Sequence, residues 1–217
     1  MPRALAELVE QHEPGIALVR SWIAQAKHPV ELLPVDRAAG EQALVALQIT
    51  SRSPMGALAL ETGGVLVDHG WVRVLGGGSP RLPRSIPSWN GMAEGRPRIP
   101  GALVVGDDVV GGVFAVNGGA LDDAPGSVHY LAPDTLAWEP IAASYSEWLV
   151  KMLTADLAKF YEGWRWPGWE RDVADLPGDR GYLLYPFPST AGPAFAERHR
   201  GAVPVEELWG LFAGGGG

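Results

Sequence analysis

Residues 101–153 constrain the fold more than any other stretch of this chain, because short strand-forming runs alternate there with turn-forming residues. The runs are rich in β-branched and aromatic residues, which favour strands; they lie at 103–105, 113–116 and 128–131. Glycine, aspartate, asparagine and proline separate the runs, and these residues tolerate tight turns. The alternation predicts an antiparallel meander in which Gly106-Asp107-Asp108 forms one of the turns.

A helix start follows the meander at Ser144-Tyr145-Ser146-Glu147. In an S-x-x-E sequence, the serine hydroxyl and the glutamate carboxylate accept hydrogen bonds from free backbone N–H groups at the start of the helix. The next apolar residues recur at helical spacing and form one face that can pack on the sheet; they are Tyr145, Trp148, Leu149 and Met152.

Before the meander, apolar residues recur with the period of a helix. We expect three helices there, over 4–9, 16–26 and 37–48. Asp36 is the predicted N-cap of the third helix, and residues 30–34 are predicted to be an extended link. From Gly56 the pattern is typical of strands, and we expect turns to join three short runs, at 57–61, 65–67 and 71–75.

The chain after the meander is predicted to contain a helix, a strand and a further helix, over 155–162, 182–187 and 204–209. Three tryptophans, Trp164, Trp166 and Trp169, lie close together in this part of the chain. They either form an aromatic binding surface or hold this part of the chain on the core. We expect the second role, because large aromatic side chains contribute strongly to core packing.

Together these patterns predict an α+β fold, with a largely antiparallel, twisted sheet, N-terminal helices packed on one face and a tryptophan-rich C-terminal extension. A chain of 217 residues is long enough for one well-buried core and is short for two. We therefore expect a core over residues 1–163, an extension packed on it over 164–213, and a disordered tail over 214–217.

The net charge of −8 narrows the class of partner. An acidic protein repels phosphate backbones and anionic membrane surfaces and attracts basic proteins, so we expect a protein partner and neither nucleic acid nor membrane. The chain has no cysteine, which excludes disulfides and thiol nucleophiles. The N-terminus contains acids where a secretory signal needs apolar residues, so a cytoplasmic location is expected.

Residues 79–100 form a proline-rich, locally basic segment, which we expect to be a long loop. Its four arginines are opposed by one acid, Glu94; they are Arg81, Arg84, Arg96 and Arg98. With Trp89 and Asn90, these guanidinium groups can bind a carboxylate or phosphate. Alternatively they pair with acids of the chain itself and fix the loop, and this is the interpretation we favour.

Asp107 and Asp108 are the candidate ligands for a hard cation such as calcium. The D-x-D-x-D-G spacing of calcium loops is absent, so a role in the turn is expected instead. The five histidines show no paired-ligand spacing, and we expect no metal and no cofactor. If the protein is an enzyme, the best candidate is His69 beside Asp68, with Arg73 near the basic loop. The Asp-His-Gly sequence is equally typical of a hairpin turn.

Three motifs of the meander resemble the core of the SUKH superfamily, which includes many bacterial immunity proteins. They are G-D-D…G-G-V-F-A-V-N, G-S-V-H-Y-L-A-P-D-T…W-E-P-I-A and S-Y-S-E-W-L. More closely, most of residues 7–208 resembles an uncharacterised bacterial family within or near that group. The motifs of this closer resemblance include S-P-M-G-A-L-A-L-E-T-G-G, D-H-G-W-V-R-V-L-G and R-W-P-G-W-E.

The resemblance implies a non-enzymatic protein-binding module, similar to immunity proteins that neutralise a toxin by binding it. A basic toxin domain is the expected partner, because the acidic charge favours such an encounter. Two other functions remain open. One is a small-ligand-binding protein or enzyme that uses residues 79–100, and the other is a structural or regulatory protein with a stable partner.

Overall fold

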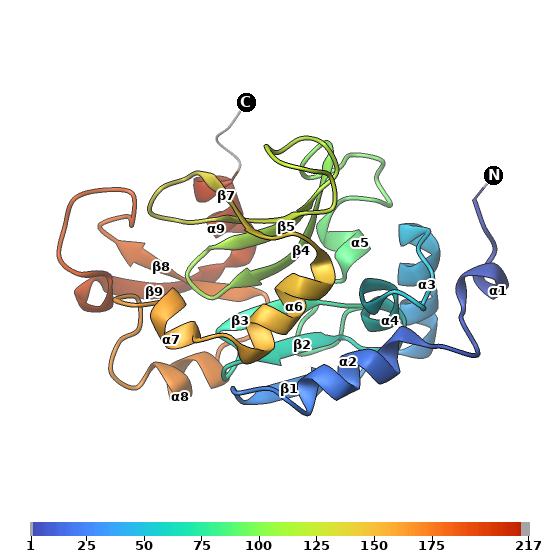
Figure 1. Ribbon diagram of the computed structural model, residues 1–217. Helices are drawn as coiled ribbons and strands as arrows, with labels where there is room; N and C mark the ends of the chain where they lie inside the picture. Colours follow the sequence, from blue (N-terminus) through green and yellow to red (C-terminus); the bar gives the residue numbers. More distant parts are fainter. Residues whose placement is uncertain (1, 214–217) are drawn as a thin grey trace.

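The computed structural model describes residues 2–213 and contains a seven-stranded antiparallel sheet (Figure 1). The strands lie side by side in their order along the chain. They are β1 Val30–Leu33, β2 Gly64–Val67, β3 Val72–Leu75, β4 Ala102–Asp108, β5 Val113–Asn117, β6 Val128–Leu131 and β7 Trp138–Ala142. The predicted α+β fold is confirmed. The predicted tail over 214–217 lies outside the described residues.

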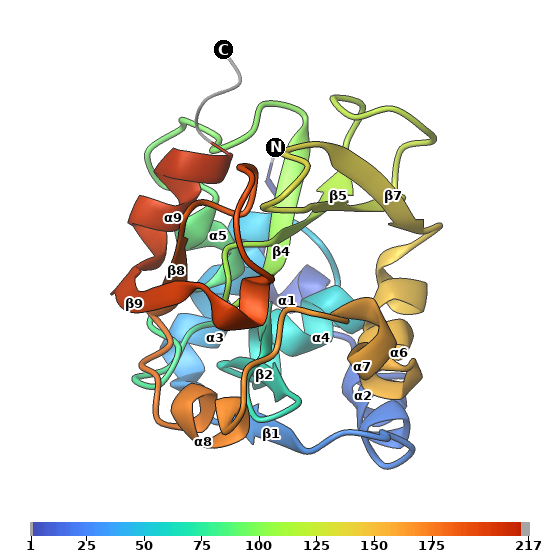
Figure 2. The ribbon, with the colours of Figure 1, turned by 90° about the vertical axis from the view of Figure 1, so that its left-hand side faces the viewer.

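Helices cover both faces of this sheet (Figure 2). The N-terminal helices α2 and α4 share one buried cluster with α6 and α7. Helices α3, α5 and α9 belong to a second cluster on the other face, to which α4 also contributes Ala59. The helices are α1 Leu5–Leu8, α2 Gly15–Ile23, α3 Arg37–Leu47, α4 Pro54–Glu61, α5 Ile86–Trp89, α6 Tyr145–Thr154, α7 Leu157–Phe160, α8 Trp169–Ala174 and α9 Val205–Phe212. Along β5, Phe114 belongs to the first cluster, whereas Val113 and Ala115 belong to the second. This alternation is the period-two pattern of a sheet buried on both sides.

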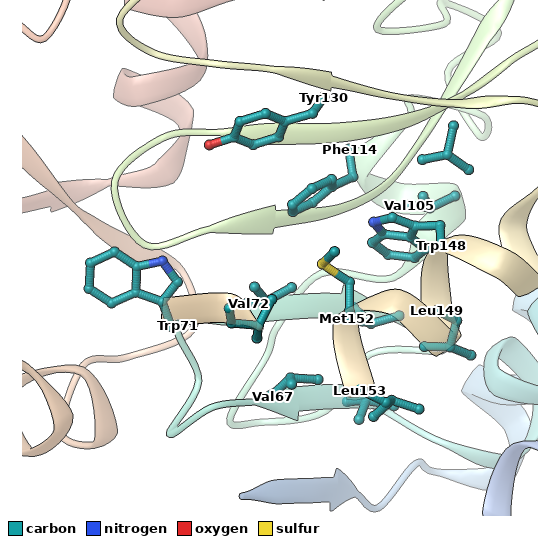
Figure 3. Close-up of a cluster of buried hydrophobic side chains, with 14 of the residues drawn as sticks. Val67, Trp71, Val72, Val105, Phe114, Tyr130, Trp148, Leu149, Met152 and Leu153 are labelled. Carbon is teal, nitrogen blue, oxygen red and sulfur yellow. The ribbon is translucent and has the colours of Figure 1, made fainter. Parts of the chain in front are cut away.

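Helix α6 packs on the sheet through the face that the sequence predicts. Trp148 and Met152 face Phe114 of β5 (Figure 3), and the ring centroids of Trp148 and Phe114 are 5.3 Å apart. The predicted helix start is confirmed, since Ser144 Oγ accepts a hydrogen bond from the backbone N–H of Glu147. The Glu147 carboxylate accepts one from the N–H of Ala143, one residue before the N-cap.

The predicted strand over 57–61 is wrong, because these residues belong to helix α4. Ser53 caps this helix by accepting from the N–H of Gly56, and Pro54 occupies its first turn, where a proline is tolerated. The sequence A-L-A-L alternates like a strand, yet alanine and leucine are also strong helix formers. Helix α4 lies between α2 and α3, and this packing buries it.

Asp107 and Asp108 do not form a turn, as the sequence analysis expected, but end strand β4 in buried positions. The predicted link over 30–34 is edge strand β1. Four helices and strands have no counterpart in the sequence prediction: helix α5, which lies in the predicted loop over 79–100, strand β7, helix α8 and strand β9 (His199–Pro204). Strand β9 pairs with β8 (Arg180–Tyr185) in a separate two-stranded sheet.

The C-terminal region packs on the main core through aromatic and arginine side chains. Trp166 is buried, and its ring centroid lies 5.7 Å from that of Trp71 next to β3. Arg198 is also buried and donates to four backbone carbonyl groups between residues 186 and 193. One guanidinium therefore holds the connection between β8 and β9. Within residues 2–213, no helix is both long and apolar enough to cross a membrane.

The contact between α3 and α4 generates a prediction about Gly40. A Cβ atom added there would lie 2.1 Å from the backbone oxygen of Leu60, so Gly40→Ala forces the two helices apart. We expect it to lower the free energy of unfolding by about 1–3 kcal/mol. The matched control is Gly210→Ala in α9, where nothing lies within 4 Å of an added Cβ. That change should raise stability by about 0.5–1 kcal/mol, because alanine is the better helix former.

Urea denaturation of the two glycine variants measures both effects. The slope of the unfolding free energy against urea concentration should be the same as in the unmodified protein. Equal stability of the Gly40→Ala variant and the unmodified protein would contradict the close packing of α3 on α4.

Candidate functional site

The most unusual feature of the interior is a carboxylate that bridges two buried arginines. Asp107 Oδ1 accepts a hydrogen bond from Arg73 Nε at 2.6 Å, and Asp107 Oδ2 accepts one from Arg84 Nη1. Arg73 and Asp107 lie directly opposite each other in the register of β3 and β4, and Arg84 comes from the basic segment that follows β3. All three residues are no more than 6% exposed. We call this group the arginine centre.

The arginine centre also holds the C-terminal region. Arg73 donates to the carbonyl oxygen of Arg180 at the start of β8, and Arg84 donates to that of Gly178 at 2.9 Å. A third bond runs from Arg73 to the carbonyl of Asp108 at 3.1 Å. Hydrogen bonds from charged donors are stronger than neutral ones. The same guanidinium groups therefore neutralise a carboxylate and tie the C-terminal region to the sheet.

The electrostatics of the centre keep Asp107 ionised. Burial alone would raise the pKa of the Asp107 carboxyl, but the charges of Arg73 and Arg84 and their hydrogen bonds outweigh burial. The pKa of Asp107 therefore lies below its ordinary value. A carboxylate of lowered pKa held between two guanidinium groups is a structural partner and a poor general base.

Asp108 faces the opposite side of the sheet from Asp107 and has a full set of hydrogen bonds. Its Oδ1 accepts from the backbone N–H groups of Val110 and Gly112, at 3.0 and 2.8 Å. Its Oδ2 accepts from the hydroxyls of Tyr130 and Tyr161, at 2.7 and 3.2 Å. Burial raises the pKa of Asp108, and the bonds from Tyr130 and the two backbone groups oppose that shift. These four donors leave its carboxylate little capacity to bind a cation.

The cavity at the arginine centre is small. It has a volume of about 10 Å³ and is bordered by Arg73, Trp89, Asp107 and Asp108 on the sheet side. Helix α9 closes it with Val205, Leu208 and Trp209. Such a volume holds about one water molecule. The structure thus brings Arg84, Trp89 and Asp107 together but leaves no room beside them for a metabolite, and the Asp108 carboxylate lies on the other side of the sheet.

The basic segment 79–100 is fixed by its own contacts. The Asn90 side chain exchanges two hydrogen bonds of 2.8 Å with the backbone of Val104 in β4. The Trp89 ring lies between two guanidinium groups, with Arg84 at 4.6 Å and Arg98 at 3.9 Å from its centroid. Arg98 also forms two 3.0 Å bonds with Glu206 of α9.

Three arginines of this segment pair with acids of the chain, as the favoured interpretation expected: Arg81 with Glu31, Arg84 with Asp107 and Arg98 with Glu206. For Asn90, the contacts are those of a residue that joins α5 to β4. The segment is therefore not an open loop. It contains α5 and is held against the sheet and α9 by its own contacts.

His69 and Arg81 lie apart from the arginine centre, beside a pocket of about 210 Å³ next to β1. Asp68 and His69 form the tip of the β2–β3 hairpin in the left-handed conformation, with φ of 56° and 60°. The predicted hairpin turn is confirmed. Asp68 pairs with Arg165 at 2.5 Å, and Arg73 belongs to the arginine centre. The structure therefore does not assemble His69, Asp68 and Arg73 into one catalytic group.

Arg165 and Arg198 are important residues that the sequence analysis missed. Arg165 lies over the rings of Trp169 and Trp71, at 4.2 and 5.1 Å from the centroids, and pairs with Asp68. No charged residue nearby in sequence signals either arginine, because the ion-pair partner of Arg165 is 97 residues away and Arg198 donates to backbone carbonyls. No group of three or more histidines, aspartates or glutamates within residues 2–213 is arranged to hold a metal ion.

The arginine centre generates a prediction for Asp107→Asn. The change leaves two buried guanidinium groups without their counter-charge, which should lower the free energy of unfolding by about 3–5 kcal/mol. The control is Glu41→Gln, which breaks the exposed pair of Glu41 with Arg37 on α3. It should change stability by no more than about 0.5 kcal/mol. Equal effects of the two changes in urea denaturation would show that the centre is not important for stability.

The stability difference between the unmodified protein and the Asp107→Asn variant should depend on pH. Because the folded-state pKa of Asp107 is depressed, its contribution is complete above the ordinary value of 3.8 and is lost as the pH falls below it. The difference in urea midpoint between the unmodified protein and Asp107→Asn should be constant from about pH 7 to about pH 5 and narrow on further acidification. A difference that widens with acid would reverse the assigned sign.

Comparison with known proteins places the chain in a family. A family model described as "Protein of unknown function DUF2625" matches residues 5–208. "Putative uncharacterized protein YbfG" of Escherichia coli (strain K12) is 41% identical over 209 residues, which cover 95% of this chain and 94% of that protein. An "Uncharacterized protein" of Haemophilus influenzae Rd is 35% identical over 208 residues, which cover 94% and 91%. The expected resemblance to uncharacterised bacterial proteins is confirmed, and the chain belongs to the DUF2625 family.

Proposed function

We propose that this protein is a non-enzymatic protein-binding module. The observation that carries the proposal is that the fold itself uses the charged residues most typical of a reactive site. Asp107 is held between Arg73 and Arg84, and the Asp108 carboxylate accepts four hydrogen bonds. Because the adjoining cavity holds only about one water molecule, a substrate has no access to these groups.

The charge distribution supports a basic protein as the partner. Among the described residues the buried charges cancel in number, since Arg73, Arg84 and Arg198 are matched by Asp68, Asp107 and Asp108. The net charge of −8 is therefore a property of the exterior. An acidic exterior increases the rate of encounter with a basic partner and disfavours acidic ones.

The resemblance of the meander to the SUKH superfamily supports a more specific form of this proposal. An immunity-type protein would bind a basic toxin domain, such as a nuclease domain, in the cytoplasm and block it. Tight complexes of this kind between DNases and immunity proteins are known, so binding alone is a sufficient mechanism. The arginine centre would then serve to keep the binding surface rigid, which lowers the entropy lost on association.

A second candidate function is the binding of a small molecule, and one observation favours it. The pocket beside β1 is bordered by His69, Arg81 and Glu31, and the side chains of all three are exposed to solvent. The sequence-based version of this hypothesis used Arg81, Arg84, Trp89 and Asn90; of these, Arg84, Trp89 and Asn90 are buried, whereas Arg81 borders this pocket. The hypothesis therefore moves from the arginine centre, with a cavity of about 10 Å³, to the pocket of about 210 Å³ at the hairpin tip.

Co-expression tests the protein-binding proposal. Cells that produce the toxic product of a neighbouring gene should grow only when this protein is also produced, and the two proteins should purify together. A variant in which Asp122, Asp123, Asp134 and Glu139 become amides reduces the exterior charge without touching the arginine centre. It should weaken the complex and its dependence on salt.

The matched control for this variant is Arg37→Gln with Glu41→Gln, which leaves the net charge unchanged and should bind as the unmodified protein does. Failure of every neighbouring gene product to bind, with growth unaffected by co-expression, would count against the immunity-type proposal. Turnover of a small molecule by the purified protein would count against the non-enzymatic one.

A further inference from the structure

We propose that the pocket at the tip of the β2–β3 hairpin binds a zwitterionic small molecule of about the size of one amino acid. The proposal goes beyond protein binding and does not rest on it. Its three recognition residues are His69, Arg81 and Glu31. They come from the hairpin tip, the basic segment and edge strand β1, three parts of the chain that only the fold brings together.

The charges at this pocket are accessible, in contrast to those of the arginine centre. The side chains of Arg81 and Glu31 are 39% and 55% exposed, and Arg81 Nε lies 3.3 Å from Glu31 Oε2. An exposed ion pair contributes only about 0–1 kcal/mol. A ligand can therefore separate the two groups at little cost. A hydrogen bond of 2.8 Å from Arg81 Nη2 to the carbonyl of Ala174 keeps the guanidinium at the pocket when the pair opens.

The hairpin turn determines where the His69 side chain lies. Asp68, His69 and Gly70 all have positive φ, of 56°, 60° and 91°, as residues of this turn. The His69 side chain is exposed and borders the pocket. Its side chain makes an edge-on contact with the Trp169 ring at 5.7 Å, which orients the imidazole.

The rest of the pocket wall is apolar and sets the chemistry of the ligand. Pro29, Val30, Leu66, Gly70 and Ala174 line it, and its volume is about 210 Å³. Pockets for drug-sized ligands have about 300–1,000 Å³, so this one fits a smaller molecule. A carboxylate suits Arg81 and His69, an ammonium group suits Glu31, and a short aliphatic side chain suits Val30 and Leu66. A free aliphatic amino acid has these three features.

Titration with leucine, followed by two-dimensional NMR, tests the proposal on the full chain. We expect saturable shifts at the backbone amides of Leu66, His69 and Gly70. Two analogues serve as controls: 3-methylbutylamine, which lacks the carboxylate, and 4-methylpentanoate, which lacks the ammonium group. Each should bind at least about tenfold more weakly than leucine, the equivalent of one lost charge-assisted contact.

Two variants separate binding from folding. Asparagine tolerates the left-handed region, so His69→Asn should keep or raise the melting temperature and yet weaken leucine binding at least about tenfold. Glu31→Gln should weaken it by a similar factor. The control is Glu41→Gln, which removes a comparable exposed partner of an arginine on α3 and should not change binding.

Three results would overturn the proposal. They are the absence of saturable shifts up to about 10 mM leucine, a concentration well above ordinary metabolite affinities, equal binding of leucine and its two analogues, and unchanged binding by both His69→Asn and Glu31→Gln. None of these results bears on the co-expression test, so failure here leaves the protein-binding proposal as it stands.

Discussion

The bridge from Asp107 to Arg73 and Arg84 is the interaction on which the rest of the structure depends. Two guanidinium groups are buried here with one carboxylate between them, and backbone carbonyls accept further hydrogen bonds from both. Two of those carbonyls belong to Gly178 and Arg180, so the same groups fix the start of β8. The C-terminal region is thus attached to the sheet by charge as well as by aromatic packing.

This arrangement changes what the charged residues mean for function. Arginines in a proline-rich segment and a pair of adjacent aspartates are typical of a ligand or metal site when only the sequence is considered. In the fold, Arg84 and the two aspartates are buried and hydrogen-bonded, and the acidic charge is left to the exterior. Arg81, by contrast, has an accessible side chain that borders a pocket together with His69 and Glu31.

The sequence predicted those elements whose signals are local. The strand runs of the meander, the Asp36 and Ser144 helix caps and the Asp68-His69-Gly70 turn each depend on residues within a few positions of one another. Helix α4 was mistaken for a strand because its alanines and leucines alternate, and the burial that decides between the two is tertiary. The arginine centre could not be foreseen, because Arg73 is 34 residues from Asp107 and 107 residues from Arg180. A local sequence pattern does not show which residues come into contact when they are so far apart in the chain.

The most direct test of this account is hydrogen exchange in the Asp107→Asn variant. The amides of Tyr182 and Val205 donate to the carbonyls of Val109 and Asp179, and these bonds hold β8 and α9 in place. If the arginine centre fixes the C-terminal region, both amides should lose protection in the variant, while that of Phe114 at the middle of the sheet keeps more of it. Uniform loss of protection across the chain, or unchanged protection at Tyr182 and Val205, would contradict the account.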